Sequence, residues 1–200
     1  RADAKTAALL ADLMTPVLKA FCTDMGFEAA NLGMQCWGGH GYIQDNGVEQ
    51  FVRDGRINMV YEGANGVQAM DLVGRKLARS GGAAPMALFA LLTGWIGEHE
   101  GDAALKPFAA GVKRATETLQ AATMWLAANG MKNPNDAGAG ATEYLRLMGI
   151  TMLALMWAMM AKAALAKDAS SRFHKDKLMC ARFWMERMVP ECPMLLERIQ

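Results

Sequence analysis

The chain has 200 residues, a length that fits one large domain or two small ones. Its 21 Lys and Arg residues nearly balance 20 Asp and Glu residues, so the chain lacks the basic field that nucleic acid binding requires, and it has no acidic tail. Hydrophobic residues make up 52% of the chain, and the strong helix formers Ala, Leu and Met outnumber the β-branched residues. Composition therefore predicts an all-α protein with no nucleic acid partner.

The first 79 residues are predicted to form the end of one helical domain. A helix over 1–14 should end at Thr15-Pro16, an N-cap residue and a first-turn proline that start a second helix. We expect Gly26 to end that second helix, and a short third helix to run from Phe27 to Cys36. The segment 37–47 holds four glycines and is predicted to be a loop.

Val48–Arg53 is predicted to form one or two helical turns, which Asp54-Gly55-Arg56 should interrupt. A further helix is predicted from about Ala64 to Arg79. Ser80-Gly81-Gly82 then begins a linker, residues 80–85, which is the best internal boundary by composition.

Beyond the linker, residues 86–200 are predicted to form an additional helical domain. Their apolar periodicity predicts long helices with short connections, as in an up-and-down bundle. A loop over Met131–Asp136 should separate two of these helices. The predicted helices cover residues 85–99, 102–129, 139–168 and 172–188.

Cysteine content, the first residues and one long apolar run bear on where the protein is located in the cell and on whether it spans a membrane. The cysteines form no C-x-x-C pair, and His is too scarce for a zinc set, so we expect thiols in a reducing cytosol and a cytoplasmic protein. The charge-rich segment 1–5 does not resemble a secretory signal, and the missing initiator Met indicates a fragment or a processed product. The uncharged run Leu147–Ala161 is shorter than the ~20 residues of a membrane span, so it predicts a buried core helix and no membrane span.

The segment Gln35-Cys36-Trp37-Gly38-Gly39-His40-Gly41-Tyr42 holds three closely spaced glycines. Such glycines let the backbone approach a ligand and point successive N–H groups at it, which suits a pyrophosphate. A tight turn without any ligand explains the same pattern. No predicted strand precedes the segment, so it is not the dinucleotide-binding fingerprint.

Glu62 lies at a predicted loop-to-helix junction, between Tyr61 and Gly63. Such a carboxylate can face a pocket, while Gly63 leaves room for a substrate. An apolar setting would disfavour its charge and raise its pKa, which suits a general base. The alternative is an acid in the first turn that stabilises the following helix.

Six motifs occur in a characteristic order and spacing: Gln35, Gly38-Gly39, Gly41-Tyr42, Val48-Glu49, Arg53-Asp54 and Tyr61-Glu62-Gly63. From about Thr15 to Leu77 this pattern closely resembles the acyl-CoA dehydrogenase family. From about Met86 onward the chain resembles, more loosely, the extra helical domain of the 3-methylthiopropanoyl-CoA dehydrogenase-like subgroup. The resemblance implies an all-α fold in which the helical bundle of the acyl-CoA dehydrogenase C-terminal domain is followed by a second helical bundle.

The resemblance also implies the chemistry of the Tyr-Glu-Gly motif. Glu62 matches the base that removes the α-proton of an acyl-CoA thioester while a β-hydride passes to FAD. Its backbone N–H matches a donor to the thioester carbonyl, where enolate charge develops. Tyr61 matches a residue that lines the acyl pocket, and Gly63 matches one beside the substrate.

Two sets of residues match cofactor-binding positions of the family. The set that reaches the FAD of a partner subunit is Gln35, Cys36, Trp37, Gly38 and Gly39, and the set that contacts the flavin within the subunit is Ala64, Asn65 and Gly66. Ala64 departs from the family pattern, which usually has Thr there. One hydrogen bond to the cofactor, worth about 1 kcal/mol, is therefore absent or replaced by water.

The resemblance implies a portion of a flavin-dependent acyl-CoA dehydrogenase that is inactive alone and forms a homodimer or homotetramer when complete. Electron-transfer flavoprotein is the implied electron acceptor. One alternative is an acyl-CoA oxidase, in which the same base serves but oxygen reoxidises the flavin. Another is a non-catalytic helical interaction module.

Overall fold

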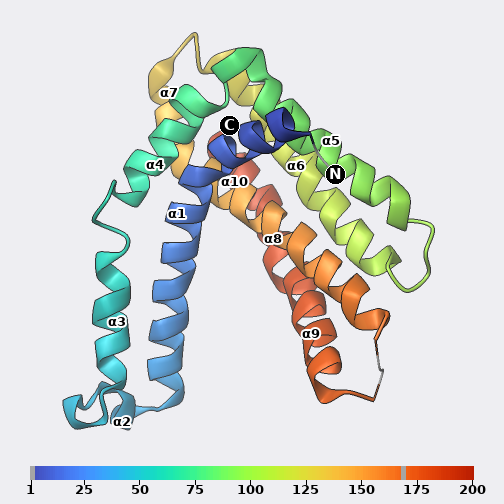
Figure 1. Cartoon of the computed structure of the whole chain (residues 1–200). Helices are drawn as coiled ribbons and strands as arrows, with labels where there is room; N and C mark the ends of the chain where they lie inside the picture. Colours follow the sequence, from blue (N-terminus) through green and yellow to red (C-terminus); the bar gives the residue numbers. More distant parts are fainter. Residues whose placement is uncertain (1–2, 168–169) are drawn as a thin grey trace.

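The computed structural model describes residues 3–167 and 170–200. Within those residues the chain is helical and has no strand, as its composition predicts (Figure 1). The α-helices are α1 (Ala4–Cys36), α2 (Gly39–Tyr42), α3 (Val48–Ile57), α4 (Asn65–Asp71), α5 (Ala83–His99), α6 (Lys106–Asn129), α7 (Pro134–Ala139), α8 (Ala141–Leu165), α9 (Arg172–Phe183) and α10 (Cys192–Ile199). Two π-helical segments, Leu72–Lys76 and Trp184–Met188, continue α4 and α9.

The predicted breaks at Thr15-Pro16 and Gly26 are wrong, because α1 runs without interruption from Ala4 to Cys36. Pro16 is buried inside it, and the Thr15 hydroxyl donates to the Ala11 carbonyl at 2.7 Å. A proline within a helix removes one backbone hydrogen bond and bends the axis, but packing can hold the helix together across it. In Figure 1, α1 (blue) changes direction, so that its first turns lie over the bundle and its second half projects away.

Two further predictions between α1 and α4 are wrong in detail. The loop over 37–47 contains α2 and a 3₁₀ turn, Gln44–Asn46. Asp54-Gly55-Arg56 does not interrupt α3, which continues to Ile57. A Cβ on Gly55 would lie 3.5 Å from the Cα of Phe27, so this glycine is a contact surface between α3 and α1 rather than a helix end.

The segment 80–85, predicted as a linker, is largely helical in the structure. A 3₁₀ helix occupies Arg79–Gly82, and α5 begins at Ala83. Gly81 and Gly82 have φ values of 65° and 79°, which glycine adopts at little cost. The helix predicted from about Ala64 to Arg79 is present as α4 and the π-helical segment that follows it, and it ends at Lys76.

The predicted helices of the second half are present as α5, α6, α8 and α9, with ends shifted by a few residues. The C-terminal limit predicted for the third, residue 168, lies outside the described residues. Part of the predicted loop Met131–Asp136 belongs to α7, and sequence reasoning missed α10.

Helix α8 is the centre of the core and packs against α6, α9, α10, α1 and α4. Tyr144, Leu147, Met148 and Ile150 on this helix are fully buried. Residues on both sides of the predicted linker therefore contribute to one hydrophobic cluster, for example Leu13 and Leu72 together with Leu88. The division into domains 1–79 and 86–200 stays a prediction.

The second half of α1 and α3 form an antiparallel pair, called here the arm, which projects from the core (Figure 1). None of the ten residues of α3, all within the described part of the chain, is buried. Large apolar side chains on the arm and its tip are exposed: Leu32, Trp37, Tyr42, Ile43, Phe51 and Ile57. This surface lacks a covering layer within the described residues.

Helices α1 and α8 are long and apolar enough to cross a membrane by length and composition. In α8, 56% of the relevant window is buried within the bundle, and core helices of soluble proteins pass the same test. The feature is therefore weak evidence of a membrane span, and the packing of α8 agrees with the core helix predicted over Leu147–Ala161.

Candidate active site

The turn between α3 and α4 contains Tyr61, Glu62 and Gly63. Glu62 has a φ of 52°, and it is the one residue other than glycine with positive φ in the described chain. Gly63 follows with a φ of 91°. A non-glycine residue in this region is strained by about 1–3 kcal/mol and persists only where the surrounding structure holds it. The strain therefore directs attention to Glu62 and to whatever holds the turn.

Asn65 holds the turn to α1 through its side-chain amide. Its Nδ2 donates to the Asp24 carboxylate at 2.6 Å and to the Ala20 carbonyl at 3.1 Å. Its Oδ1 accepts from Lys19 Nζ at 2.8 Å and from the Thr23 hydroxyl at 3.3 Å. The Asn65 backbone N–H donates to the Met59 carbonyl. The polar hydrogens of Asn65, a predicted cofactor contact, are thus engaged within the chain.

Lys19 completes this contact. Its Nζ also donates to the Gly63 carbonyl oxygen at 2.6 Å. Sequence reasoning did not identify Lys19, Thr23 or Asp24 as functional residues. The available signal was their spacing, because Lys19 and Thr23 stand four residues apart and so share one face of a helix.

The Glu62 side chain is exposed, and Tyr61 beside it is 46% exposed. The enclosed, apolar setting expected for Glu62 is therefore not provided by the described residues. The Glu62 backbone N–H has no acceptor among those residues either. The motif thus presents one carboxylate and one unused amide donor on an open surface.

An apolar groove on the arm lies close to this turn. Its lining residues are Phe27, Val52, Arg53, Arg56, Ile57 and Val60, and its volume is about 420 Å³. Arg56 lies over the Phe27 ring, 6.0 Å from its centroid, so the groove has a cationic rim and an apolar floor. Val60, the last of these lining residues along the chain, precedes Glu62 by two residues.

The glycine segment forms the tip of the arm (Figure 1). Gly38 has a φ of 60°, and a Cβ on the buried Gly41 would lie 2.5 Å from the Met34 carbonyl oxygen, so both positions require glycine. Trp37 is 60% exposed, and a Cβ on Gly38 or Gly39 would meet no atom within 4 Å. Gln35 and Cys36 are exposed as well.

The structure does not bring the two predicted segments together within one chain. The glycine segment precedes α3 and the Glu62 turn follows it, so they lie at opposite ends of that helix. Ten residues of α-helix span roughly 15 Å. A compact site that uses both segments would therefore need two chains, whereas an extended ligand could touch both in one.

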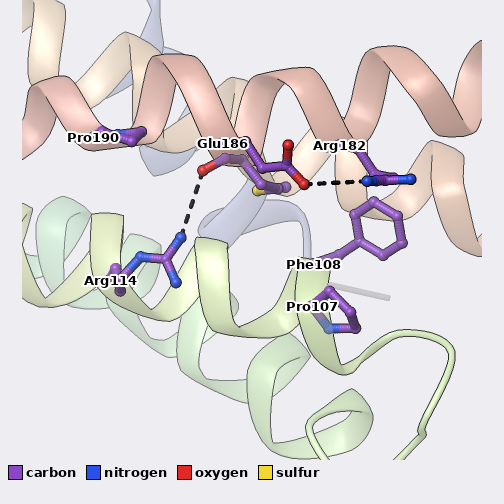
Figure 2. A pocket seen from close by; sticks show the side chains of 7 residues that line it. Pro107, Phe108, Arg114, Arg182, Glu186 and Pro190 are labelled. Carbon is purple, nitrogen blue, oxygen red and sulfur yellow. Dashed lines mark hydrogen bonds and ion pairs between the residues drawn. The ribbon is translucent and has the colours of Figure 1, made fainter.

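A second cavity, of about 240 Å³, lies between α6 and the segment from α9 to Pro190 (Figure 2). Arg182 pairs with Glu186 at 3.5 Å, and Arg114 Nη2 donates to the Met185 carbonyl at 3.5 Å. Pro107 and Phe108 form its apolar wall (Figure 2). No predicted site residue lines this cavity.

Two family models together match nearly the whole chain. Residues 2–77 match the acyl-CoA dehydrogenase C-terminal domain, and residues 86–200 match the model described as acetyl-CoA dehydrogenase C-terminal like. The chain belongs to the acyl-CoA dehydrogenase family. The resemblance inferred from the spacing of the motifs is therefore confirmed, as is the all-α fold.

The relatives include 3-methylmercaptopropionyl-CoA dehydrogenase of Ruegeria pomeroyi, 36% identical over 198 residues, which cover 96% of this chain and 33% of that protein. The broad-specificity linear acyl-CoA dehydrogenase FadE5 of Mycobacterium tuberculosis is 28% identical, over 94% of this chain and 33% of its own. The chain spans about a third of the length of these curated relatives.

The fold resembles that of Caenorhabditis elegans ACDH-11, solved in complex with C11-CoA. The TM-score is 0.69, with 19% sequence identity, over 94% of this chain and 30% of that one. This likeness concerns the fold. It agrees with the predicted succession of helical bundles.

Proposed function

We propose that the complete protein catalyses α,β-dehydrogenation of an acyl-CoA thioester, with Glu62 as the base that removes the α-proton. The observation that carries this proposal is the conformation of Glu62. Its backbone is strained at a φ of 52°, its carboxylate is exposed and its N–H has no acceptor among the described residues. Strain that is retained beside an unused donor is typical of catalytic turns.

Each group of the turn has a proposed task. The carboxylate of Glu62 takes the α-proton, while its N–H donates to the thioester carbonyl oxygen and stabilises the enolate-like charge. Tyr61 lines the acyl chain, and Gly63 lies beside the thioester. The names of the two relatives, both acyl-CoA dehydrogenases, support this reaction class.

FAD is the proposed cofactor, and when bound it supplies the acceptor for the hydride that leaves the β-carbon. The tip of the arm fits such a group, because Trp37 is exposed and the backbone at Gly38 and Gly39 has open space beside it. We propose that Gln35–Gly39 contact the FAD of a partner subunit. Ala64 and Gly66 would contact the flavin of their own subunit, together with Asn65, whose polar hydrogens are engaged with α1 and Met59.

The proposed assembly follows from the arm. Its exposed apolar side chains, Phe51 and Trp37 among them, suit coverage by the remaining two thirds of the polypeptide and by a partner subunit. We therefore propose a homodimer or homotetramer of the complete protein, with this portion inactive alone. We also propose electron-transfer flavoprotein as the electron acceptor. A cytoplasmic location is a further proposal, which the four free thiols suit.

The reaction class can be tested on the full-length protein. Anaerobic addition of a panel of acyl-CoA thioesters should bleach the flavin spectrum and yield the 2-enoyl product. Glu62→Gln should prevent bleaching while flavin stays bound, and the exposed Glu197→Gln should behave as wild type. Rapid peroxide release in air would instead indicate an oxidase. A full-length protein that binds flavin but is not bleached by any thioester would support the non-catalytic module.

A further inference from the structure

The strained turn has few backbone contacts of its own. Its ends are fixed where the Tyr61 N–H donates to the Ile57 carbonyl and the Asn65 N–H donates to the Met59 carbonyl. Between them, the N–H groups of Glu62, Gly63 and Ala64 have no acceptor among the residues that the structure describes. Backbone hydrogen bonding therefore does not explain why Glu62 keeps a φ of 52°.

The shorter contacts that hold the turn come from α1, and a longer one comes from α4, where Gln68 Nε2 donates to the Gly63 carbonyl at 3.4 Å. Lys19 Nζ donates to the Gly63 carbonyl at 2.6 Å and to Asn65 Oδ1 at 2.8 Å, so one ammonium group joins the residue after Glu62 to the first residue of α4. Hydrogen bonds from a charged donor are stronger than neutral ones. Because Lys19 is half-buried, water competes less for its donors than at an exposed lysine.

The base of this contact is rigid. Ala20 and Phe21, which follow Lys19, are 1% and 3% exposed and pack in the core. Asp24, one turn further along α1, accepts from Asn65 at 2.6 Å and balances the lysine charge through that amide. Lys19 thus links the packed helix α1 to the carbonyl of Gly63, the residue directly after Glu62.

We propose that Lys19 is a positioning residue for Glu62. By holding the Gly63 carbonyl it keeps the Glu62 carboxylate and N–H in the geometry that α-proton removal requires. This inference rests on the proposed function. A displacement of about 1 Å at a reacting group can slow a reaction on the order of a hundredfold.

The test uses the full-length protein with its flavin bound. Lys19→Met removes both donors at similar length, Lys19→Arg keeps a cation, and Lys132→Met is the control at an exposed loop lysine. We expect Lys19→Met to lower kcat roughly ten- to a hundredfold with KM and flavin content little changed, and Lys19→Arg to restore part of the rate. An α-deuterated thioester should show a larger isotope effect on kcat in Lys19→Met, because proton removal then limits turnover.

A double-mutant cycle separates positioning from general stability. In a Glu62→Gln background, Lys19→Met should cause a much smaller loss in the single-turnover rate, since the carboxylate that it positions is gone and only the backbone N–H of residue 62 remains. An equal loss in both backgrounds, or a wild-type rate for Lys19→Met alone, would overturn the inference. If Lys19→Met does not fold, Lys19→Gln takes its place in the cycle. A fully active Glu62→Gln would instead overturn the proposed function itself.

Discussion

The aromatic ring of Phe21 on α1 lies directly against Gly149 on α8. A Cβ on Gly149 would lie 2.4 Å from two carbons of that ring, far inside van der Waals contact. The contact joins the two regions that separate family models match. The glycine therefore sets how closely the helix that carries Lys19 approaches the centre of the core.

Gly149→Ala should destabilise the full-length protein by about 1–3 kcal/mol, because the added methyl forces the Phe21 ring or α8 to shift. The measurement is the thermal midpoint of unfolding. The control is Gly94→Ala on α5, where a Cβ would meet nothing within 4 Å and alanine should be neutral or slightly stabilising. Equal midpoints for the two variants would show that the contact is looser than the structure indicates.

Ala64 offers a gain-of-function test. It is the N-cap of α4 and provides no side-chain hydrogen bond to that helix. Ala64→Thr should add a hydroxyl that caps α4 and raises the free energy of unfolding by about 1 kcal/mol. The same hydroxyl should also donate to the flavin and tighten FAD binding roughly fivefold. Titration of the apoprotein with FAD measures the affinity, with Ala64→Val as the matched control. An equal gain from valine would assign the effect to bulk rather than to the hydroxyl.

Cys192 predicts a dependence of stability on pH. Burial raises the pKa of this thiol to about 12, against about 8.5 in an unfolded chain. The folded state therefore keeps the proton that the unfolded state loses, so this contribution is complete below about pH 8.5 and declines as pH rises towards 12. Near pH 10 the slope approaches about 1.4 kcal/mol per pH unit.

The variant that tests this is Cys192→Ala, with the exposed Cys180→Ala as control. The difference in free energy of unfolding between wild type and Cys192→Ala should shrink between pH 8 and 10. Cys180→Ala, compared at the same pH values, reports the effect of removing a thiol at an exposed site. A Cys192→Ala difference that does not change with pH would mean that the thiol is not protected from ionisation in the folded state.

Much of the fold follows from local sequence, and the errors have a common cause. Pro16, Gly26 and Gly55 were expected to end or interrupt helices, yet each lies inside one. Pro16 is buried and Gly55 touches Phe27, so tertiary packing outweighs the local preference of these two residues. Helix α10 was not predicted. Pro190 and Pro193 lie in the first turns of the 3₁₀ helix Val189–Glu191 and of α10, where proline is compatible with a helix.

The candidate site was predictable in part. The family motifs identified Glu62 and the glycine segment by residue order alone. The contact from Lys19 to Gly63 spans 44 residues and depends on how α1 lies against α4, which local patterns do not encode. The exposure of Glu62 was also unforeseen, because the walls expected around it are not among the described residues.

The most direct test of the base assignment is the single-turnover rate of flavin reduction by a saturating acyl-CoA thioester. With equal flavin bound to wild type, Glu62→Gln and Glu62→Asp, the glutamine variant should be slower by roughly 10²- to 10⁴-fold, the range that general base catalysis supplies. The aspartate variant should retain part of the rate, because a shorter carboxylate is still a base. A Glu62→Gln rate close to that of wild type would contradict the assignment of Glu62 as the base.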